Sequence, residues 1–349
     1  MGRLFGTDGI RGVVNAGLDA RLAFQVGMAA AYVMAEAKGG GQPRFTIGKD
    51  TRISSDLLEG ALVAGLCSAG ADVLHLGVIP TPAVAWITVD AKADAGIVIS
   101  ASHNPFEHNG IKIFDHRGFK LSDALEGKIE EIVLSRTAVP LKTHGEIGRV
   151  IYADEKEAQD YIDYLVSTVD TDLSGLHILV DCANGAASAT AARLFDRFPD
   201  LHTDVIHADP DGVNINHGCG STHLDSLRAM VKAGGYDLGI AFDGDADRCL
   251  AVDEMGNLIL PNTVSESFGK LLKAHGLRHI RFHDLRHSCA SLLLKQGVPM
   301  KQIQEWLGHS DISTTANIYA HLDSQSKQLS AAPMEKALAL PEELPESRW

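Results

Sequence analysis

Residues 237–248 read DLGIAFDGDADR, a short apolar segment that runs directly into an acidic, glycine-containing turn. The apolar part has the length and composition of a buried strand. The turn carries Asp243, Asp245 and Asp247 at alternate positions, so their oxygens can converge on one point, as a hard divalent cation such as magnesium requires. This stretch therefore predicts a sheet of buried strands with a metal site beyond a strand end.

Two other structures can carry such an acidic turn. A solvent-exposed turn needs no metal, and an EF-hand calcium loop would place Glu254 at its twelfth position. Arg248 stands where an EF-hand loop needs glycine, and the flanking segments are typical of strands rather than helices. On the turn alone, the magnesium site and the solvated turn both stay open.

A second polar strand end lies at residues 95–105, AGIVISASHNP. Ser102 follows the apolar run and is itself followed by His103. A serine in this place can carry a phosphoryl group that backbone amides and a nearby cation stabilise. A serine hydrolase is less well supported, because there is no G-x-S-x-G elbow and adjacent serine and histidine side chains seldom face each other.

The fold class follows from the pattern up to about residue 255, where apolar, β-branched runs alternate with helical stretches. This pattern is typical of α/β domains whose parallel sheets are covered by helices. The predicted strands are FTIGKD, ADVLHLG, AGIVIS, HILVDCANG and DLGIAFDGD. A charged stretch around residues 140–160 separates two such blocks. We therefore predict two α/β/α domains, residues 1–150 and 151–257, with sites beyond the carboxyl ends of their strands.

The last quarter of the chain has a different periodicity. From Pro261 onward, successive helix-length segments are stopped by Gly, Pro or His, so residues 258–323 are predicted to be mostly helical. After about residue 324 the sequence holds several prolines and no sustained periodicity. We expect residues 324–349 to be a frayed helix and a disordered tail.

The bulk composition is that of an ordinary globular protein, with 45% hydrophobic and 22% charged residues among 349. No apolar run reaches the roughly 20 residues of a membrane span, and the N-terminus has no signal-peptide core, so a cytoplasmic location without a membrane partner is expected. Five cysteines without C-x-x-C spacing fit reduced thiols. Residues 1–260 hold 21 Lys and Arg against 36 Asp and Glu, which argues against nonspecific nucleic-acid binding there.

Several motifs occur in an order and spacing that resembles the alpha-D-phosphohexomutase family over Met1 to about Asn257. They are FGTDGIRG (5–12), GKDTRISS (48–55), SASHNP with NGIKIF (100–114), NINHGCGSTH (214–223) and DGDADR (243–248). The CGSTH segment is more similar to the amino-sugar branch, the bacterial phosphoglucosamine mutases, than to the phosphomannomutases or phosphoglucomutases.

The resemblance implies phosphoryl transfer through a phosphorylated Ser102. Magnesium would be held by the phosphate on Ser102 together with Asp243, Asp245 and Asp247. The implied reaction interconverts glucosamine 6-phosphate and glucosamine 1-phosphate through a bisphosphate intermediate. The implied partners are the phosphorylated amino sugar and a sugar bisphosphate activator.

The same resemblance implies the remaining site residues. Arg11, His103, Lys112 and Arg248 would line the site, and Lys112 would be the candidate for acid and base work at the sugar hydroxyl. Cations of this kind offset charge on a group that passes between oxygens. Without the family motifs, Lys112 and Arg248 could equally be surface ion-pair residues.

The sequence departs from the family pattern after the acidic turn. The family has four domains, of which the third supplies a sugar-recognition loop and the fourth a phosphate-binding loop rich in Ser, Gly and Thr. Neither loop can be recognised after residue 257. We therefore expect the phosphoserine and metal chemistry to be retained and sugar turnover to be impaired.

The final quarter resembles a second family. His283 and Arg286 in FHDLRH lie three residues apart and would share a helix face. With His309 in LGHS and Tyr319 ten residues later, they resemble the C-terminal catalytic segment of tyrosine recombinases, the phage integrases, over residues 261–322. The resemblance implies that Tyr319 attacks a DNA phosphate, while the other three residues stabilise the transition state and handle protons.

This second resemblance is partial. The upstream catalytic arginine, the hairpin lysine and the N-terminal DNA-clamping domain of the recombinases have no counterpart before Pro261. Residues 261–322 hold seven Lys and Arg against four acidic residues, so at most weak DNA binding is expected. Three functions stay open: an impaired mutase, a DNA-binding or strand-cleaving protein, and an inactive gene fusion.

Overall fold

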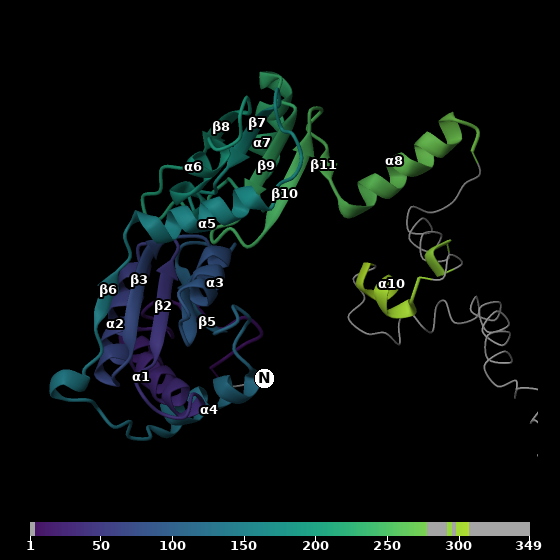
Figure 1. The fold of residues 1–349 in the computed structure, drawn as a ribbon. Coiled ribbons are helices and arrows are strands. Elements are labelled where there is room, and N and C mark those ends of the chain that lie inside the picture. Colours follow the sequence, from purple (N-terminus) through teal and green to yellow (C-terminus); the bar gives the residue numbers. More distant parts are fainter. Residues whose placement is uncertain (1–3, 278–291, 295–297, 307–349) are drawn as a thin grey trace, which may run out of the picture. The chain divides into compact units, whose positions relative to one another are not determined.

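The computed structural model describes residues 4–277, 292–294 and 298–306. The chain divides into two compact units, Met1–Ile259 and Leu260–Trp349. Unit 1 contains two sheets with helices packed on their faces, and its course runs from purple to green in Figure 1.

The first sheet of unit 1 has six strands in the order β1-β5-β4-β2-β3-β6. The strands are β1 (Ile10–Val13), β2 (Arg44–Lys49), β3 (Asp72–Val78), β4 (Ala95–Ile99), β5 (His108–Asp115) and β6 (Val150–Tyr152). Strands β2, β3, β4 and β6 run parallel, whereas β5 is antiparallel to β4 and to β1. Because β2 and β4 are parallel neighbours, the loops that follow Lys49 and Ile99 emerge at the same edge of the sheet.

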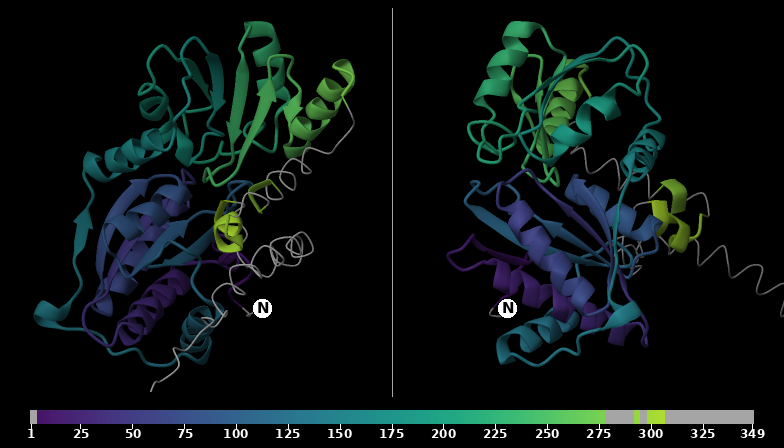
Figure 2. Two further views of the ribbon diagram at one scale, coloured as in Figure 1. Left: turned by 45° about the vertical axis from the view of Figure 1, so that its right-hand side comes forward. Right: turned by 90° about the vertical axis from the view of Figure 1, so that its left-hand side faces the viewer.

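Helices cover both faces of this sheet (Figure 2). The helices are α1 (Ala20–Ala37), α2 (Ser55–Ser68) and α4 (Asp123–Ser135) on one face, and α3 (Thr81–Asp90) and α5 (Glu155–Ser167) on the other. Helix α1 begins after Asp19, whose side chain accepts a hydrogen bond from the Leu22 amide. All five residues of β4 are buried, because both faces of that strand are covered.

The second sheet has five strands in the order β11-β10-β9-β7-β8. The strands are β7 (His177–Asp181), β8 (His202–Ile206), β9 (Leu238–Phe242), β10 (Cys249–Asp253) and β11 (Leu258–Ile259). Strand β7 is parallel to β8 and β9, and β10 is antiparallel to β9 and β11. Helix α7 (Asp225–Gly234) covers one face, and η2 (Ala186–Ala189) with α6 (Ala191–Phe195) covers the other.

The α/β prediction for this part of the chain is confirmed, and the five strands predicted from apolar runs correspond to β2, β3, β4, β7 and β9. Both sheets are mixed rather than wholly parallel, since β5 and β10 run against their neighbours. The charged stretch around residues 140–160 is more than a connection. It contains β6, which extends the first sheet just past residue 150, and the start of α5, which packs on α3 through Tyr161.

The described part of unit 2 is helical, as the sequence predicts. It consists of α8 (Pro261–Ala274), residues 292–294, and α10 (Met300–Trp306) with the residues around them. The predicted tail, residues 324–349, lies outside the described residues. Among the described helices, none combines the length and hydrophobicity that crossing a membrane requires.

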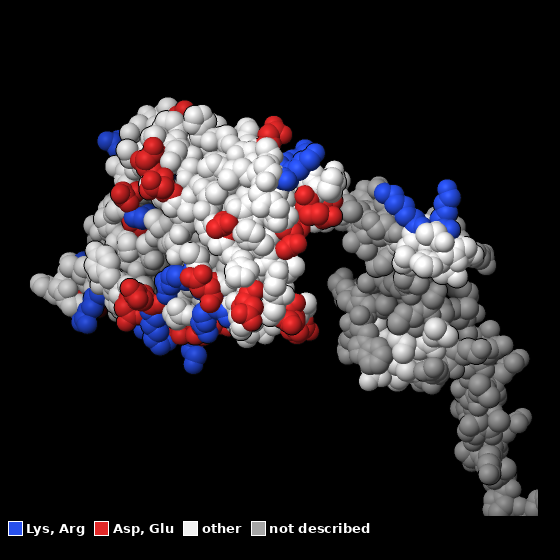
Figure 3. Space-filling model, turned by 90° about the horizontal axis from the view of Figure 1, so that it is seen from above, with Lys and Arg blue, Asp and Glu red and all other residues white. Residues whose placement is uncertain are grey.

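The surface of unit 1 is mixed in charge. On the face drawn in Figure 3, Asp and Glu side chains stand among Lys and Arg side chains, without a continuous basic area. Residues 1–260 carry 36 acidic against 21 basic residues. Acidic residues thus outnumber basic residues in this part of the chain.

Candidate active site

Two polar loops that follow strands of different sheets meet within unit 1. One follows β4 and carries Ser102, and the other follows β9 and carries Asp243. The Ser102 hydroxyl donates a hydrogen bond to Oδ2 of Asp243 over 2.5 Å, and both residues are fully buried. Ser102 has a φ of 55°, a left-handed conformation that is uncommon for a residue other than glycine. The loop thus presents the serine in a strained conformation that its surroundings must maintain.

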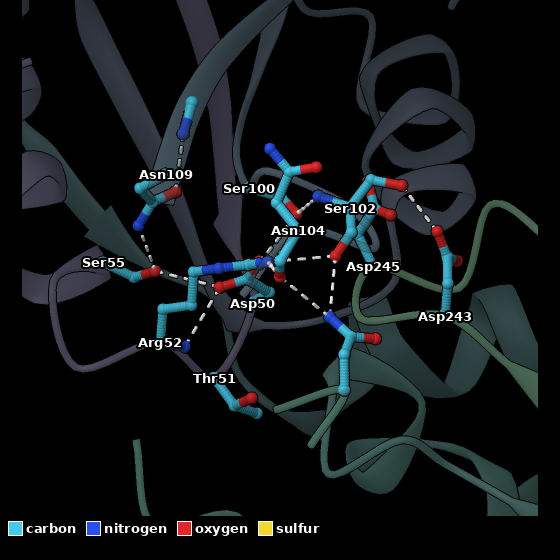
Figure 4. A network of polar contacts seen from close by, with 12 residues as sticks. Asp50, Thr51, Arg52, Ser55, Ser100, Ser102, Asn104, Asn109, Asp243 and Asp245 are labelled. Atoms are coloured by element: carbon cyan, nitrogen blue, oxygen red, sulfur yellow. Dashed lines mark hydrogen bonds and ion pairs between the residues drawn. The ribbon is translucent and has the colours of Figure 1, made fainter. Parts of the chain in front are cut away.

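Arg52 fixes this loop from its buried side (Figure 4). Its guanidinium donates hydrogen bonds to the carbonyl oxygens of Ser102, at 3.0 Å, and Asn104, at 2.6 Å. The same guanidinium forms an ion pair with Asp50, and neither side chain is exposed. Asp50 also accepts hydrogen bonds from the Arg52 amide and the Ser55 hydroxyl. The loop that follows β2 supplies this pair, and Ser102 lies on the loop that follows the neighbouring strand β4. The position of the serine is therefore fixed jointly by the ends of these two strands.

The second sheet contributes a further clamp. The side-chain amide of Asn216 donates to the carbonyl oxygens of Ser102 and Asn104, at 3.0 and 3.3 Å. Gly244 lies so close that a Cβ atom there would stand 2.6 Å from the Ser102 carbonyl oxygen. A side chain at position 244 would therefore push the acidic loop away from the serine.

The acidic loop is arranged as a cation site. Oxygen atoms of Asp243, Asp245 and Asp247 all lie within 4.8 Å of one another. Oδ2 of Asp245 accepts a hydrogen bond from the Thr81 hydroxyl, but its Oδ1 is buried and has no partner among the described residues. A buried carboxylate oxygen without a partner is costly unless a cation occupies the space it faces. The donor set, all oxygen and all acidic, fits magnesium.

Burial and mutual repulsion set the charge states of these carboxylates. Burial, and then the negative charge of Asp245, raise the pKa of Asp243 to about 6. Burial also acts to raise the pKa of Asp245, but the ammonium group and hydrogen bond of Lys112 outweigh it and lower that pKa. Without a cation, Asp245 is therefore the more readily ionised of the two.

Lys112 neutralises part of this negative charge. From β5 its ammonium group lies 2.9 Å from Asp245, 3.3 Å from Asp247 and 3.4 Å from Asp8. Burial alone would lower the pKa of Lys112, but these three carboxylates together raise it. Lys112 is therefore protonated in this arrangement. A cavity of about 100 Å³ beside it is also lined by Lys120.

The outer part of the site contains three cationic or titratable groups. Arg248 donates a hydrogen bond of 2.9 Å to Nδ1 of His103 and lies 3.8 Å from Asp247. Burial, and then the charges of Arg248 and Arg11, lower the pKa of His103, so its imidazole is neutral with the hydrogen on Nε2. Arg11 forms an ion pair with Asp8. Two guanidinium groups and a neutral imidazole therefore lie next to the acidic loop.

The structure brings together all the residues that the first resemblance assigns to the site. They are Arg11, Ser102, His103, Lys112, Asp243, Asp245, Asp247 and Arg248. The sequence interpretation missed the supporting residues Asp8, Asp50, Arg52, Thr81 and Asn216. Four of these stand inside or beside the quoted motifs, but only the fold shows that Arg52 is buried and ion-paired.

Models of known protein families match most of unit 1. A model described as phosphoglucomutase/phosphomannomutase, alpha/beta/alpha domain I, matches residues 2–139, and the model of domain II matches residues 159–256. Phosphoglucosamine mutase of Clostridium acetobutylicum is 52% identical over 280 residues, which cover 80% of this chain and 62% of the relative. That of Clostridium novyi is 53% identical over 277 residues, covering 79% and 61%. The chain thus spans about three fifths of the length of these relatives.

Solved structures agree on the fold. A phosphoglucomutase/phosphomannomutase family protein from Burkholderia thailandensis superimposes with a TM-score of 0.63 at 30% identity, covering 78% of this chain and 59% of that one. A structure from Thermus thermophilus that is described as a phosphomannomutase gives 0.64 at 24% identity, covering 79% and 63%. The alignments with the two phosphoglucosamine mutases extend over 280 and 277 residues. Both are longer than the first 257 residues, over which the sequence motifs extend.

The phage integrase family model matches residues 239–326, which confirms the second resemblance. Its match begins earlier than Pro261 and overlaps the match of mutase domain II. The recombinase-like residues His283, Arg286, His309 and Tyr319 all lie outside the described residues. Their predicted arrangement therefore stays a prediction.

Proposed function

Since the chain belongs, over residues 2–256, to the phosphoglucomutase/phosphomannomutase family, we propose that Ser102 carries a phosphoryl group and exchanges it with a phosphorylated amino sugar. The proposed substrates are glucosamine 6-phosphate and glucosamine 1-phosphate, which are interconverted through a bisphosphate. The observation that carries the proposal is the buried contact between the Ser102 hydroxyl and Asp243 of the acidic loop, with Lys112 of β5 beside Asp245 of the same loop.

In the proposed step, a sugar hydroxyl oxygen attacks the phosphorus, and the bond between phosphorus and Ser102 Oγ breaks. The sugar hydroxyl proton ends on Ser102 Oγ, which then donates to Asp243 as in this structure. The surrounding carboxylates raise the pKa of Lys112 and so keep its ammonium group protonated, where it supplies positive charge beside the transferring group. Lys112 can also relay the proton, giving its own to the leaving oxygen and taking the sugar hydroxyl proton in its place.

Asp243, Asp245 and Asp247 would hold magnesium, with the phosphate on Ser102 as a further ligand. Magnesium would neutralise charge on the transferring phosphoryl group. The unpartnered Oδ1 of Asp245 supports this assignment. Arg11, His103 and Arg248 would bind the non-transferring phosphate or the sugar at the rim of the site.

The first test is incorporation of labelled phosphate from a sugar bisphosphate into the full chain in the presence of magnesium. We expect label on Ser102, located by peptide mass spectrometry, and none in Ser102→Ala. Ser135→Ala, at an exposed serine on α4, is the matched control and should be labelled like the wild type. Label that persists in Ser102→Ala, or a wild type that takes up none, would overturn the proposal.

Sugar turnover is a separate property and needs its own assay. A coupled assay for glucosamine 1-phosphate, with magnesium and a bisphosphate activator, measures it directly. Labelled Ser102 without turnover would mean that the carrier chemistry is retained while sugar exchange is lost. Serine-dependent turnover would mean that this chain is a working mutase.

DNA binding through residues 261–322 is the second candidate, and the phage integrase match favours it. A titration of fluorescent duplex DNA with the full chain tests it at low salt. Binding that depends on Arg286 would support this candidate, because a phosphate contact needs that charge. Binding unaffected by Arg286→Ala would show a nonspecific electrostatic contact only.

A further inference from the structure

A second cluster of metal-ligating groups lies in the second sheet of unit 1, apart from the acidic loop. Asp181 is the last residue of β7, and His207 directly follows β8. Cys219 lies on the loop between β8 and α7. Because β7 and β8 are parallel neighbours, with Asp181 paired to Ile206, their ends bring the carboxylate and the imidazole to one place.

Three possible ligand atoms lie close together. The carboxylate oxygen of Asp181, a ring nitrogen of His207 and the Cys219 sulfur all lie within 4.8 Å of one another. Asp181 and Cys219 are fully buried. Carboxylate, imidazole and thiolate together form a donor set typical of zinc, which binds oxygen, nitrogen and sulfur.

The histidine supplies the decisive detail. Nδ1 of His207 lies 3.1 Å from Oδ1 of Asp181, which is close enough for a hydrogen bond. Nevertheless, Nδ1 is buried and makes no hydrogen bond to any described residue. The distance to Asp181 is short enough, so the angle at the ring nitrogen is what does not fit a hydrogen bond. A ring nitrogen and a carboxylate oxygen that are adjacent, yet not aimed at each other, are arranged like two ligands of one ion.

Backbone groups hold the carboxylate in this orientation. Oδ1 of Asp181 accepts a hydrogen bond from the Ala183 amide at 2.8 Å, and Oδ2 accepts one from the Gly220 amide at 2.9 Å. His207 has a φ of 49°, in the left-handed region that is uncommon for residues other than glycine. Backbone hydrogen bonds that orient a carboxylate in this way are frequent around metal ligands.

We propose that Asp181, His207 and Cys219 bind a zinc-type divalent ion, with a water molecule as the fourth ligand. Two negative ligands balance the charge of a divalent ion, and the thiol loses its proton on binding. The ion joins residue 181 to the 207–219 segment, and that segment carries Asn216, which holds the Ser102 loop.

The probe for this site is Co²⁺, which replaces zinc and gives a thiolate-to-metal charge-transfer absorption in the near ultraviolet when sulfur is a ligand. The full chain is first treated with a chelator and then with excess Mg²⁺, so that the all-oxygen acidic loop is occupied. We expect Co²⁺ to bind with the thiolate absorption, at one ion per chain, and Zn²⁺ to abolish that absorption.

Two variants test the ligands, and a third is their control. Cys219→Ser and His207→Asn should each lose the thiolate absorption or weaken Co²⁺ binding at least tenfold. His207→Asn keeps the backbone intact, because asparagine tolerates a left-handed φ better than histidine. Cys182→Ser is the matched control, since Cys182 is equally buried and packs in an apolar cluster instead. It should bind Co²⁺ like the wild type.

Several outcomes would overturn the proposal. A wild type without thiolate absorption, or one in which Cys219→Ser and His207→Asn both retain it, excludes this site. Loss of the absorption in Cys182→Ser alone would place the sulfur ligand elsewhere. Asp243→Asn should leave the absorption unchanged, because Asp243 belongs to the other cluster.

Discussion

At the scale of single residues, the Arg52–Asp50 pair decides where the serine lies. Both side chains are fully buried, and Arg52 also binds two carbonyl oxygens of the Ser102 loop. We expect Arg52→Met to lower the free energy of unfolding by about 3–5 kcal/mol, because it leaves the buried carboxylate of Asp50 without its counter-charge. Urea unfolding of the full chain measures this loss.

The matched control is Arg117→Met. Arg117 also pairs with an aspartate two residues away, Asp115, but its side chain is 67% exposed. Solvent screens this pair, so the loss should stay below about 1 kcal/mol. Equal losses in Arg117→Met and Arg52→Met would show that burial of the Arg52 pair does not matter.

Asp243 gives a prediction for pH in magnesium-free buffer. Its pKa is raised from 3.8 to about 6, mainly by burial. The folded state therefore binds the proton more tightly than the unfolded state, and the wild type loses stability as the pH rises from about 4 through 6. Asp243→Asn has no carboxyl group to ionise here and does not lose stability in this way. Between pH 4 and pH 8 its free energy of unfolding should therefore rise, relative to that of the wild type, by up to about 3 kcal/mol.

The measurement is urea unfolding of both proteins with EDTA at these two pH values. Magnesium should reverse the trend in the wild type, because a bound cation favours the ionised carboxylate. A stability difference between wild type and Asp243→Asn that does not change with pH would contradict the raised pKa.

At the scale of elements, the close contact of α1 and α2 depends on a glycine. A Cβ atom on Gly65 of α2 would collide with the Phe24 carbonyl oxygen of α1. We expect Gly65→Ala to destabilise the chain by about 1–3 kcal/mol, because the two helices would have to move apart. Thermal or urea unfolding detects this.

Gly60, on the same helix, is the control. It is exposed, and no atom lies within 4 Å of a Cβ built there. Gly60→Ala should stabilise α2 by about 0.5–1 kcal/mol, since alanine loses less conformational freedom in a helix. If both alanine variants were neutral or stabilising, the helices would be less closely packed than the structure shows.

The strands that the sequence predicts are short apolar runs that end in polar or glycine-containing turns, and their burial differs, since β4 is fully buried and β3 is mostly half-buried. The apolar runs of β4 and β7 are continuous, so they can be recognised without any partner strand. Strand β6, at the edge of the first sheet, has only three residues, all exposed, and β10, between β9 and β11, is only partly buried. Both strands are defined by their pairing, which a local pattern does not contain.

The site residues also divide into those that the sequence predicts and those that it does not. Ser102 and the aspartates of the acidic loop are predictable because they follow buried strands, where polar residues collect. The Asp181, His207 and Cys219 cluster is not, since its members lie far apart in the sequence and no motif joins them. Only the parallel pairing of β7 and β8 brings them together. The burial of Arg52 is likewise a result of the fold rather than of its charged neighbours.

At the scale of the whole molecule, unit 1 has hydrophobic clusters on both faces of its two sheets. Among the described residues, the members of these clusters all lie between Leu4 and Leu258. Both metal clusters, and the contacts that hold Ser102, also lie within Met1–Ile259. A fragment of this length is large enough to bury a sizeable core.

We therefore expect a chain of residues 1–259 to fold cooperatively and to keep the phosphorylation of Ser102. Its urea midpoint should match that of the unit 1 transition in the full chain, because the described members of the unit 1 clusters are all retained. The dependence of the free energy of unfolding on urea concentration should match as well, since it reports the surface that becomes exposed on unfolding. A fragment with native-like secondary structure but no cooperative transition would instead mean that residues after Ile259 complete the core.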